Sequence, residues 1–197
     1  SLAAVRPAIG YRRGALCVVD IETLLDRACA DLSELRAGLR LEDVTWSPDD
    51  LYILYTGGTT GMPKGVLWRQ ADIFVTALGG QTQAQTGEEF DSLEPIVERA
   101  VSGRSAMRVL PSPPFMHGAA HWSAFHTFHM GGTVLLPANT HHLVADDIWS
   151  TVEREKAQAL LIVGDAFGRP LLAGLSHRNY DLSSPALLIS GGAPLNA

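Results

Sequence analysis

The sequence has no long hydrophobic run and no recognisable secretion signal. None of its apolar stretches approaches the ~20 residues that a membrane-spanning helix requires. The first ten residues, SLAAVRPAIG, lack the basic, apolar and cleavage regions of a signal peptide. We therefore expect a soluble protein without a transmembrane segment, whose contact with membranes is at most peripheral.

Cysteine and clustered positive charge are also scarce. Two cysteines, Cys17 and Cys29, are too few for a disulfide scaffold in a chain of 197 residues, and they favour reduced thiols in the cytoplasm. The formal net charge is −6, and no run of lysine or arginine could follow a nucleic-acid backbone. Polynucleotide binding is therefore not expected. A chain of 197 residues is also long enough to bury a hydrophobic core.

Glycine and threonine are concentrated in one segment, directly after the strand-like sequence LYILYT of residues 51–56. The nine positions from Thr56 to Lys64 hold three glycines, three threonines, one proline and one lysine. Glycine lets several backbone N–H groups converge on an anion, while threonine hydroxyls and the Lys64 ammonium add donors and positive charge. The segment predicts a phosphate-binding loop. Residues 66–68 are expected to return as a second strand, so that the loop forms the tip of a hairpin.

Two familiar phosphate loops do not fit this segment. A Walker loop is disfavoured because Pro63 precedes the lysine and Gly65 follows it, where a hydroxyl residue is needed. The glycine spacing also fails the dinucleotide fingerprint, and no acidic residue follows at the ribose distance. The remaining alternative is a glycine- and threonine-rich hairpin without a ligand.

A second informative segment is a strand over residues 107–110 that runs into the proline-rich loop PSPPFMHG. The loop presents His117, which we interpret as functional, and Gly118 permits close approach to a bound molecule. Four histidines, at positions 117, 121, 126 and 129, raise the alternative of a metal site. The H-E-x-x-H glutamate is absent, so we predict no metal ligands and interpret His126 and His129 as ordinary helix residues.

Alternating strands and helices predict an α/β fold with a mainly parallel sheet flanked by helices. Expected helices cover 21–39 with Asp20 as N-cap, 70–83, 93–101, 122–130, 146–156 with Asp146 or Asp147 as N-cap, and 166–175. Expected strands cover 15–19, 133–137, 159–163 and 186–190. The acidic residues between 82 and 105 indicate a solvated insertion.

The last predicted strand leads into the sequence Ser190 to Leu195, SGGAPL, at the carboxyl edge of the sheet, where ligands gather in such folds. Small residues there would let a flat ring lie against the backbone. Asp165 either faces this pocket or caps the following helix.

The sequence YTGGTTGMPKGV resembles the signature of the adenylate-forming, or AMP-binding, enzymes, T-S-G-T-T-G-x-P-K-G, with Gly57 where serine is commonest. The segment MPKGVLWRQ looks most like the acyl-CoA synthetase branch, the fatty-acid CoA ligases. The His117 loop and the SGGAPL segment resemble two further core motifs of this family.

The resemblance implies an ATP-dependent ligase that forms an acyl-adenylate and then an acyl-CoA. Its substrates would be a small-molecule carboxylic acid, ATP and coenzyme A as co-substrate, with Mg²⁺ on the phosphates. The implied catalytic residue is His117, and the implied substrate-binding residues are His117, Gly118, His121 and Trp122. The implied ATP-binding residues are Thr56, Gly57, Gly58, Thr59, Thr60, Gly61, Lys64, Gly191, Gly192, Ala193 and Pro194.

The resemblance also implies a larger N-terminal domain, of which this chain is a fragment. Residues 1–50 would end a truncated preceding subdomain, and 51–197 would form the nucleotide- and acyl-binding subdomain. Because family segments that complete the site are missing, we expect the fragment alone to be inactive. The acyl chain and assembly into a homo-oligomer stay open. Alternatives are another adenylate-forming enzyme, such as an amino-acid adenylation domain or a luciferase-like enzyme, or a non-catalytic nucleotide- or metal-binding module.

Overall fold

The structure is a computed structural model that describes residues 8–12, 15–19, 47–56, 64–81 and 92–196. The chain divides into two compact units, Ser1–Ser47 and Pro48–Ala197. In the first unit, strand β1 (Ala8–Arg12) pairs antiparallel with β2 (Ala15–Val19). The predicted strand over 15–19 is confirmed. The helix predicted over 21–39, with Asp20 as its N-cap, lies outside the described residues.

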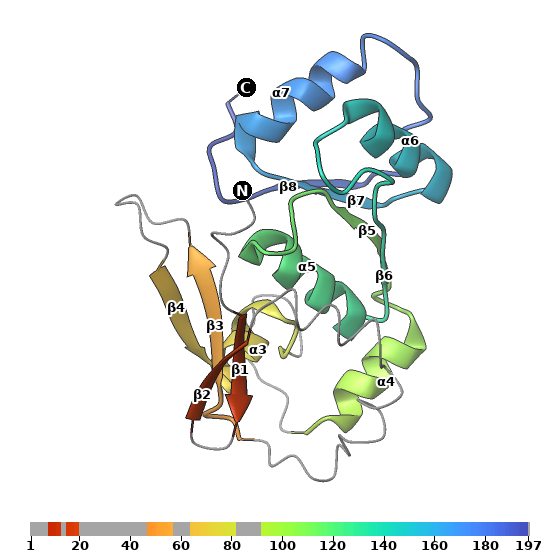
Figure 1. Cartoon of the computed structure of the whole chain (residues 1–197). Helices are drawn as coiled ribbons and strands as arrows, with labels where there is room; N and C mark the ends of the chain where they lie inside the picture. The colour runs from red at the N-terminus through yellow and green to blue at the C-terminus, as the bar shows by residue number, and fades with distance from the viewer. Residues whose placement is uncertain (1–7, 13–14, 20–46, 57–63, 82–91, 197) are drawn as a thin grey trace, which may run out of the picture. The chain divides into compact units, whose positions relative to one another are not determined.

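The second unit begins with another antiparallel hairpin. Strand β3 (Leu51–Thr56) pairs with β4 (Lys64–Arg69), in a register that runs from Leu51 opposite Arg69 to Thr56 opposite Lys64. The predicted return of the chain as a hairpin is confirmed, and the second strand is longer than the expected 66–68. The hairpin forms a two-stranded sheet of its own (Figure 1).

A four-stranded parallel sheet forms the centre of this unit. Its order is β6 (Thr133–Val134), β5 (Arg108–Pro111), β7 (Ala159–Ile162) and β8 (Leu187–Ser190), and all neighbouring pairs are parallel. All four residues of β7 are buried, as expected for a central strand of an α/β fold. The predicted fold class is confirmed.

The described part of this unit contains five helices, three of which lie on the faces of the sheet. The five helices are α3 (Gln70–Ala77), α4 (Glu94–Ser102), α5 (Gly118–His129), α6 (Ala145–Glu155) and α7 (Gly164–Gly174). Helices α6 and α7 lie on one face of the sheet and α5 on the other (Figure 1). The main core joins Leu110 and Leu160 of the sheet to Val152 of α6 and Leu171 of α7.

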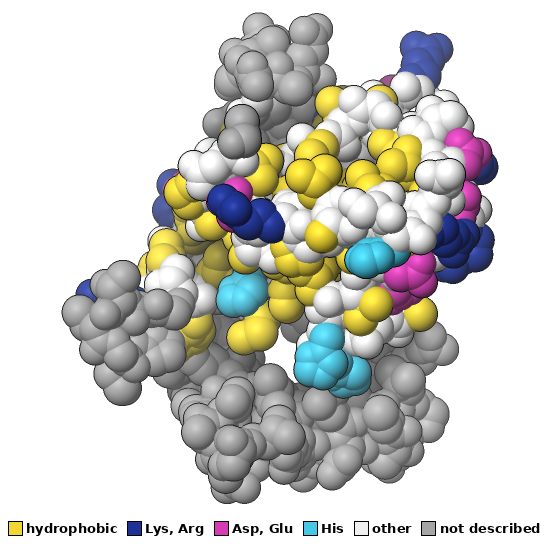
Figure 2. Space-filling model, turned by 90° about the horizontal axis from the view of Figure 1, so that it is seen from above, with side chains coloured by type: hydrophobic (Ala, Val, Ile, Leu, Met, Phe, Trp, Pro, Cys, Tyr) yellow, Lys and Arg dark blue, Asp and Glu magenta, His cyan; other side chains and the backbone are white. Residues whose placement is uncertain are grey.

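The edge strand β8 is apolar but stays exposed. Leu187, Leu188 and Ile189 are 49%, 60% and 42% exposed, in contrast to the buried residues of β7. Hydrophobic side chains also reach the surface elsewhere, with histidines beside them on the face shown in Figure 2. The apolar sequence therefore predicted the strand correctly, but it did not predict what fraction of the β8 side chains would be buried.

Several helix boundaries differ from the predictions. Helix α3 ends at Ala77 and not near Gln83, because Gly79 adopts φ +95°, a left-handed conformation that stops the helix. Helix α5 begins at Gly118, four residues before the expected Trp122, directly after the extended residue His117. The strand expected over 133–137 is confined to Thr133–Val134.

Two predicted helix caps are wrong. The N-cap of α6 is Val144, and the carboxylate of Asp147 instead accepts hydrogen bonds from the backbone N–H groups of Ala138 and Asn139, at 3.2 and 2.6 Å. Asp146 lies in the first turn of α6. Helix α7 begins at Gly164, two residues before the expected Ala166, and its N-cap is Val163, so Asp165 is not a cap.

Candidate active site

The β3–β4 hairpin brings the two ends of the predicted phosphate loop together. Thr56 lies opposite Lys64 in the last pair of the hairpin, and the Thr56 hydroxyl donates to the Lys64 carbonyl at 3.3 Å. Both residues are exposed, so the Lys64 side chain is available to an anion. The loop residues Gly57, Gly58, Thr59, Thr60 and Gly61 lie outside the described residues, and their role stays a prediction.

The same hairpin packs against the start of α5. A Cβ atom on Gly118 would lie 2.8 Å from Leu54 Cδ2, so a larger residue here would require the Leu54 side chain to shift. The rings of Trp68 and Trp122 meet edge to face with centroids 6.2 Å apart. The start of α5 therefore lies close to the strand that precedes the predicted phosphate loop.

His117 lies at the junction of the proline-rich loop and α5. Its backbone is extended, its N–H donates to the Pro114 carbonyl at 3.0 Å, and its carbonyl accepts from the His121 N–H at 3.2 Å. The side chain is exposed. The loop thus presents an accessible imidazole one helical turn before His121, as a substrate-contacting residue requires.

His121 and Trp122 converge on Tyr52 of β3, a residue that sequence reasoning missed. The Trp122 indole N–H donates to the Tyr52 hydroxyl oxygen at 3.1 Å, and this oxygen lies 3.3 Å from both ring nitrogens of His121. Burial raises the pKa of Tyr52 and lowers the pKa of His121, because it penalises the charged form of each group. No sequence signal distinguishes Tyr52 from any other strand tyrosine.

A cavity of about 300 Å³ lies beside the proline-rich loop. Its walls are mostly apolar, with Pro113, Phe115 and Phe167 among them, and His141 and His142 add polar groups. The backbone N–H groups of both histidines donate to the Asn139 side-chain oxygen at 3.0 Å. His117, His121 and Trp122 are not among the residues that line this cavity.

The segment after β8 packs over the beginning of α7. The Gly164 N–H donates to the Ser190 hydroxyl at 3.0 Å, and the Asp165 N–H donates to the Pro194 carbonyl at 3.0 Å. Gly164 has φ +48°, and a Cβ atom there would lie 2.3 Å from the Pro194 oxygen, so glycine is required. The predicted nucleotide-binding residues Gly192, Ala193 and Pro194 stay exposed above this junction, whereas Gly191 is partly covered.

Asp165 does not cap α7, whose N-cap is Val163, and it contacts the segment after β8 instead. Its carboxylate accepts hydrogen bonds from the Asn196 backbone N–H and side-chain amide, both at 2.9 Å, and pairs with Arg169 at 3.0 Å. The hydrogen bond from the Asn196 amide is the main reason that the pKa of Asp165 falls to about 2. Asp165 therefore anchors the end of the segment that follows β8.

Metal clusters and membrane spans are absent from the described part of the chain. Among residues 8–12, 15–19, 47–56, 64–81 and 92–196, no three His, Cys, Asp or Glu side chains cluster as metal ligands. Within these same ranges, no helix combines the length and apolarity needed to cross a membrane.

Comparison with known proteins gives one family and several relatives. The family described as "AMP-binding enzyme" matches residues 4–197. The chain is 51% identical over 148 residues to the medium-chain acyl-CoA ligase Mig of Mycobacterium avium, covering 75% of this chain and 26% of the relative. It is 41% identical over 152 residues to the medium/long-chain-fatty-acid–CoA/3-oxocholest-4-en-26-oate–CoA ligase of Mycolicibacterium smegmatis, covering 75% of this chain and 27% of that protein.

Solved structures share the fold. The inhibitor-bound N-terminal domain of FACL13 from Mycobacterium tuberculosis has a TM-score of 0.59 at 24% identity, covering 85% of this chain and 37% of that one. VinN has a TM-score of 0.60 at 18% identity, and the match covers 87% of this chain and 38% of VinN. The chain spans about a quarter of the length of the curated relatives that it matches. By the extent of the family match and the identity to these relatives, the chain belongs to the AMP-binding enzyme family.

Proposed function

We propose that the protein carrying this chain is an ATP-dependent fatty-acid–CoA ligase. The carboxylate of the acid attacks the α-phosphorus of ATP to give an acyl-adenylate and pyrophosphate, and the CoA thiolate then displaces AMP to give the thioester. The observation that carries the proposal is the packing of β3 on α5 at Leu54 and Gly118. It joins the strand that leads into the phosphate loop to the turn that presents His117. The names of the two curated relatives support this reaction.

The triphosphate would be held by the hairpin tip. Its donors are the backbone N–H groups and hydroxyls of Thr56, Gly57, Gly58, Thr59, Thr60 and Gly61, together with the Lys64 ammonium. Charge-assisted hydrogen bonds of this kind contribute roughly 1.5–3 kcal/mol each. Such a site catalyses mainly by positioning the phosphates and neutralising their charge. None of these residues needs to act as a nucleophile.

We propose that Mg²⁺ accompanies ATP, where it would neutralise phosphate charge. The described ends of the loop, Thr56 and Lys64, offer one hydroxyl and no carboxylate. Phosphate oxygens would therefore supply most of the ligands of the ion. The adenine ring would lie against Gly191, Gly192, Ala193 and Pro194, whose small side chains leave the backbone accessible.

The acid would bind beside the start of α5. The exposed His117 imidazole would orient the carboxylate as the catalytic residue, and Gly118, His121 and Trp122 would form the adjoining wall. His121 and Trp122 are held by Tyr52 in the structure, so this wall has a defined shape. A pocket wall of defined shape favours acids whose acyl chains match it over acids whose chains do not.

The organisation and location of the protein are part of the proposal. Residues 1–50 would end a preceding subdomain, and 51–197 would form the nucleotide- and acyl-binding subdomain of a larger N-terminal domain. The low cysteine content supports a cytoplasmic location, where thiols stay reduced.

The proposal is tested on the full-length protein, with Mg-ATP, CoA and a panel of medium- and long-chain fatty acids. We expect thioester formation together with pyrophosphate release. Lys64→Ala should lower kcat/KM for ATP by about 10- to 100-fold, the equivalent of one lost charge-assisted hydrogen bond. Arg104→Ala removes an exposed cation from the turn after α4 and should leave the rate unchanged.

ATP binding can be measured separately from turnover. ATP should raise the Tm of the wild-type protein, and both Lys64→Ala and Thr60→Ala should reduce this increase. Absence of turnover with every acid, or equal rates for wild type and Lys64→Ala, would overturn the proposed function.

The isolated 197-residue chain gives a further check. Because it spans about a quarter of its curated relatives, we expect pyrophosphate release by this chain alone to stay at background. Clear turnover would show that residues 1–197 contain a complete active site.

A further inference from the structure

We propose that Tyr52 is a positioning residue of the acid-binding site, whose hydroxyl fixes the side chains of His121 and Trp122. The inference rests on the proposed function, since these two residues are proposed to line the acyl pocket. Tyr52 belongs to β3, whereas both of its partners belong to the first turns of α5. Its hydroxyl therefore connects two segments that are 69 and 70 residues apart in the sequence.

The chemistry of the groups fixes the direction of one hydrogen bond in this cluster. An indole N–H can only donate, so the Tyr52 oxygen must accept from Trp122. The Tyr52 proton is then free to point at His121, whose ring nitrogens lie 3.3 Å from the hydroxyl oxygen. A neutral imidazole has one unprotonated nitrogen to accept it. The Tyr52 hydroxyl thus joins Trp122 to His121, with the direction of the second contact set by the His121 tautomer.

The surroundings keep this arrangement in place. The Tyr52 and His121 rings meet edge to face with centroids 5.4 Å apart, and the other side of His121 lies against Phe125, at 5.1 Å. Trp122 packs edge to face on Trp68 of β4. Burial favours the neutral forms of both Tyr52 and His121, since it raises the pKa of the first and lowers that of the second.

Position in the chain gives the cluster its functional meaning. Tyr52 lies four residues before Thr56, where the predicted phosphate loop begins, and it points to the same side of β3 as Leu54. His121 lies one helical turn after His117 and is hydrogen-bonded to its carbonyl. The Tyr52 hydroxyl therefore holds the acid-binding wall in register with the strand that leads to the triphosphate.

The test compares Tyr52→Phe with Tyr55→Phe in the full-length enzyme. Tyr52→Phe keeps the ring and removes only the hydroxyl, so we expect the KM for the acid to rise about two- to tenfold, the effect of one lost hydrogen bond. The KM for ATP should stay unchanged. Tyr55 lies on the same strand with 51% of its surface exposed, and Tyr55→Phe should alter neither KM. A purely structural role would lower the active fraction and leave both KM values unchanged.

A spectroscopic measurement reports on the same contact without turnover. In ¹⁵N-labelled protein, the Trp122 indole N–H resonance should shift in Tyr52→Phe, because its acceptor is gone. The Trp149 indole N–H, which donates to the Leu171 carbonyl at 2.8 Å, should not shift and serves as an internal reference. The Trp122 resonance should be unchanged in Tyr55→Phe.

The outcomes distinguish a failure of the role of Tyr52 from a failure of the proposed ligase function. Wild-type turnover combined with an unchanged acid KM in Tyr52→Phe, or with an unshifted Trp122 resonance, would overturn the role of Tyr52 and leave the proposed function intact. A wild-type protein that turns over no acid would overturn the proposed function and, with it, the positioning of the acid by Tyr52.

Discussion

The carboxylate of Asp165 is bound twice by Asn196, through the backbone N–H and the side-chain amide of that residue, both at 2.9 Å. The two residues are 31 positions apart and join the first turn of α7 to the segment after β8. Since the proposed adenine-binding residues Gly191 to Pro194 lie between β8 and Asn196, this contact restrains one wall of the proposed nucleotide site.

The Asp165 contact predicts a specific titration. Its pKa of about 2 is below the ordinary value of 3.8, so the ionised form is favoured in the folded state. The contact therefore stabilises the fold above about pH 4 and weakens as the pH falls from there toward 2. Carboxyl ¹³C NMR should show this low midpoint for Asp165. In Asn196→Ala the midpoint should rise toward 3.8, and in Arg169→Ala it should rise less; an unchanged midpoint in Asn196→Ala would contradict the assignment.

Gly164 should tolerate no side chain. Gly164→Ala combines a left-handed φ, which costs roughly 1–2 kcal/mol for a residue with a Cβ, with an overlap on Pro194 that adds roughly 1–3 kcal/mol. Gly103→Ala is the matched control, because Gly103 also has a positive φ, +63°, but a Cβ atom there would meet no other atom within 4 Å. Urea unfolding should show the larger loss for Gly164→Ala. Equal losses would mean that the overlap with Pro194 is relieved at no cost.

His121 should make the fold sensitive to mild acid. Burial lowers its pKa below the ordinary 6.5, so the unfolded chain binds a proton more readily than the folded protein. Stability should therefore decrease as the pH falls below about 6.5, until His121 is also protonated in the folded state. Urea unfolding between about pH 7 and pH 5 should show a smaller decrease for His121→Gln, which keeps a polar partner for Tyr52 but cannot charge. The same decrease in both proteins would argue against this role.

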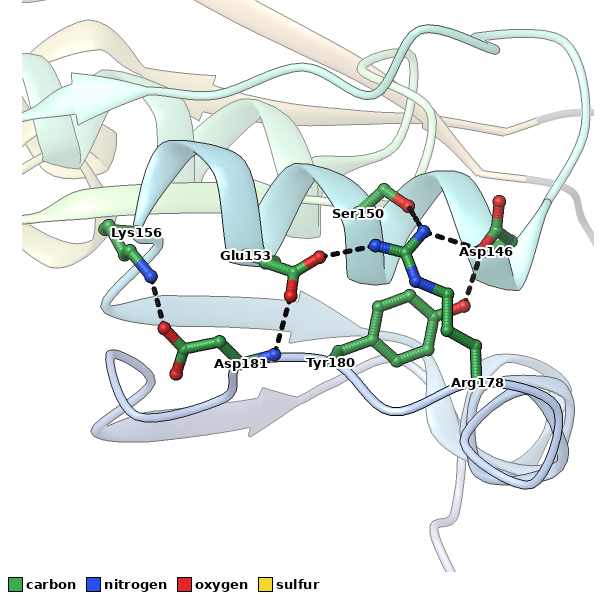
Figure 3. A network of polar contacts seen from close by, with 7 residues as sticks. All are labelled: Asp146, Ser150, Glu153, Lys156, Arg178, Tyr180 and Asp181. Atoms are coloured by element: carbon green, nitrogen blue, oxygen red, sulfur yellow. Dashed lines mark hydrogen bonds and ion pairs between the residues drawn. The ribbon is translucent and has the colours of Figure 1, made fainter.

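A network of charged and polar residues ties the segment after α7 to α6 (Figure 3). Glu153 accepts from the Arg178 guanidinium at 2.7 Å and from the Asp181 N–H at 2.8 Å. The Tyr180 hydroxyl donates to Asp146 at 2.6 Å, and the Arg178 guanidinium lies 4.8 Å from the centre of the Tyr180 ring. Glu153 is therefore the acceptor that joins both parts of the segment to the helix.

Glu153→Ala should lower the free energy of unfolding by about 1–2 kcal/mol. This loss is smaller than the contribution of two charge-assisted hydrogen bonds in a buried site, because solvent reaches this network. Arg154→Ala, one residue along α6, removes an exposed pair with Glu155 and a long 3.5 Å hydrogen bond to the Thr151 hydroxyl, and should change stability by less than about 0.5 kcal/mol. Thermal or urea unfolding measures both values. A Glu153→Ala effect as small as that of Arg154→Ala would show that the network contributes little to stability.

Local pattern was sufficient for most elements of the fold. The β3–β4 hairpin, the buried β7 strand and the parallel sheet follow from short-range alternation, turn residues and the succession of strands and helices. Helix ends were less accurate, because a left-handed residue such as Gly79 stops a helix and a tertiary partner can take a side chain away from the expected cap, as the Asn139 N–H does with Asp147. A sequence window does not show which of these occurs.

By itself, the sequence determined the secondary-structure order, the fold class and the composition of the proposed phosphate loop, because these depend on residues a few positions apart. Only the tertiary structure decided that Tyr52 meets Trp122, and that Asp165 meets Asn196 instead of capping a helix. Such partners are chosen when distant segments pack together, since each buried or charged group then pairs with the donor or acceptor that packing brings within reach.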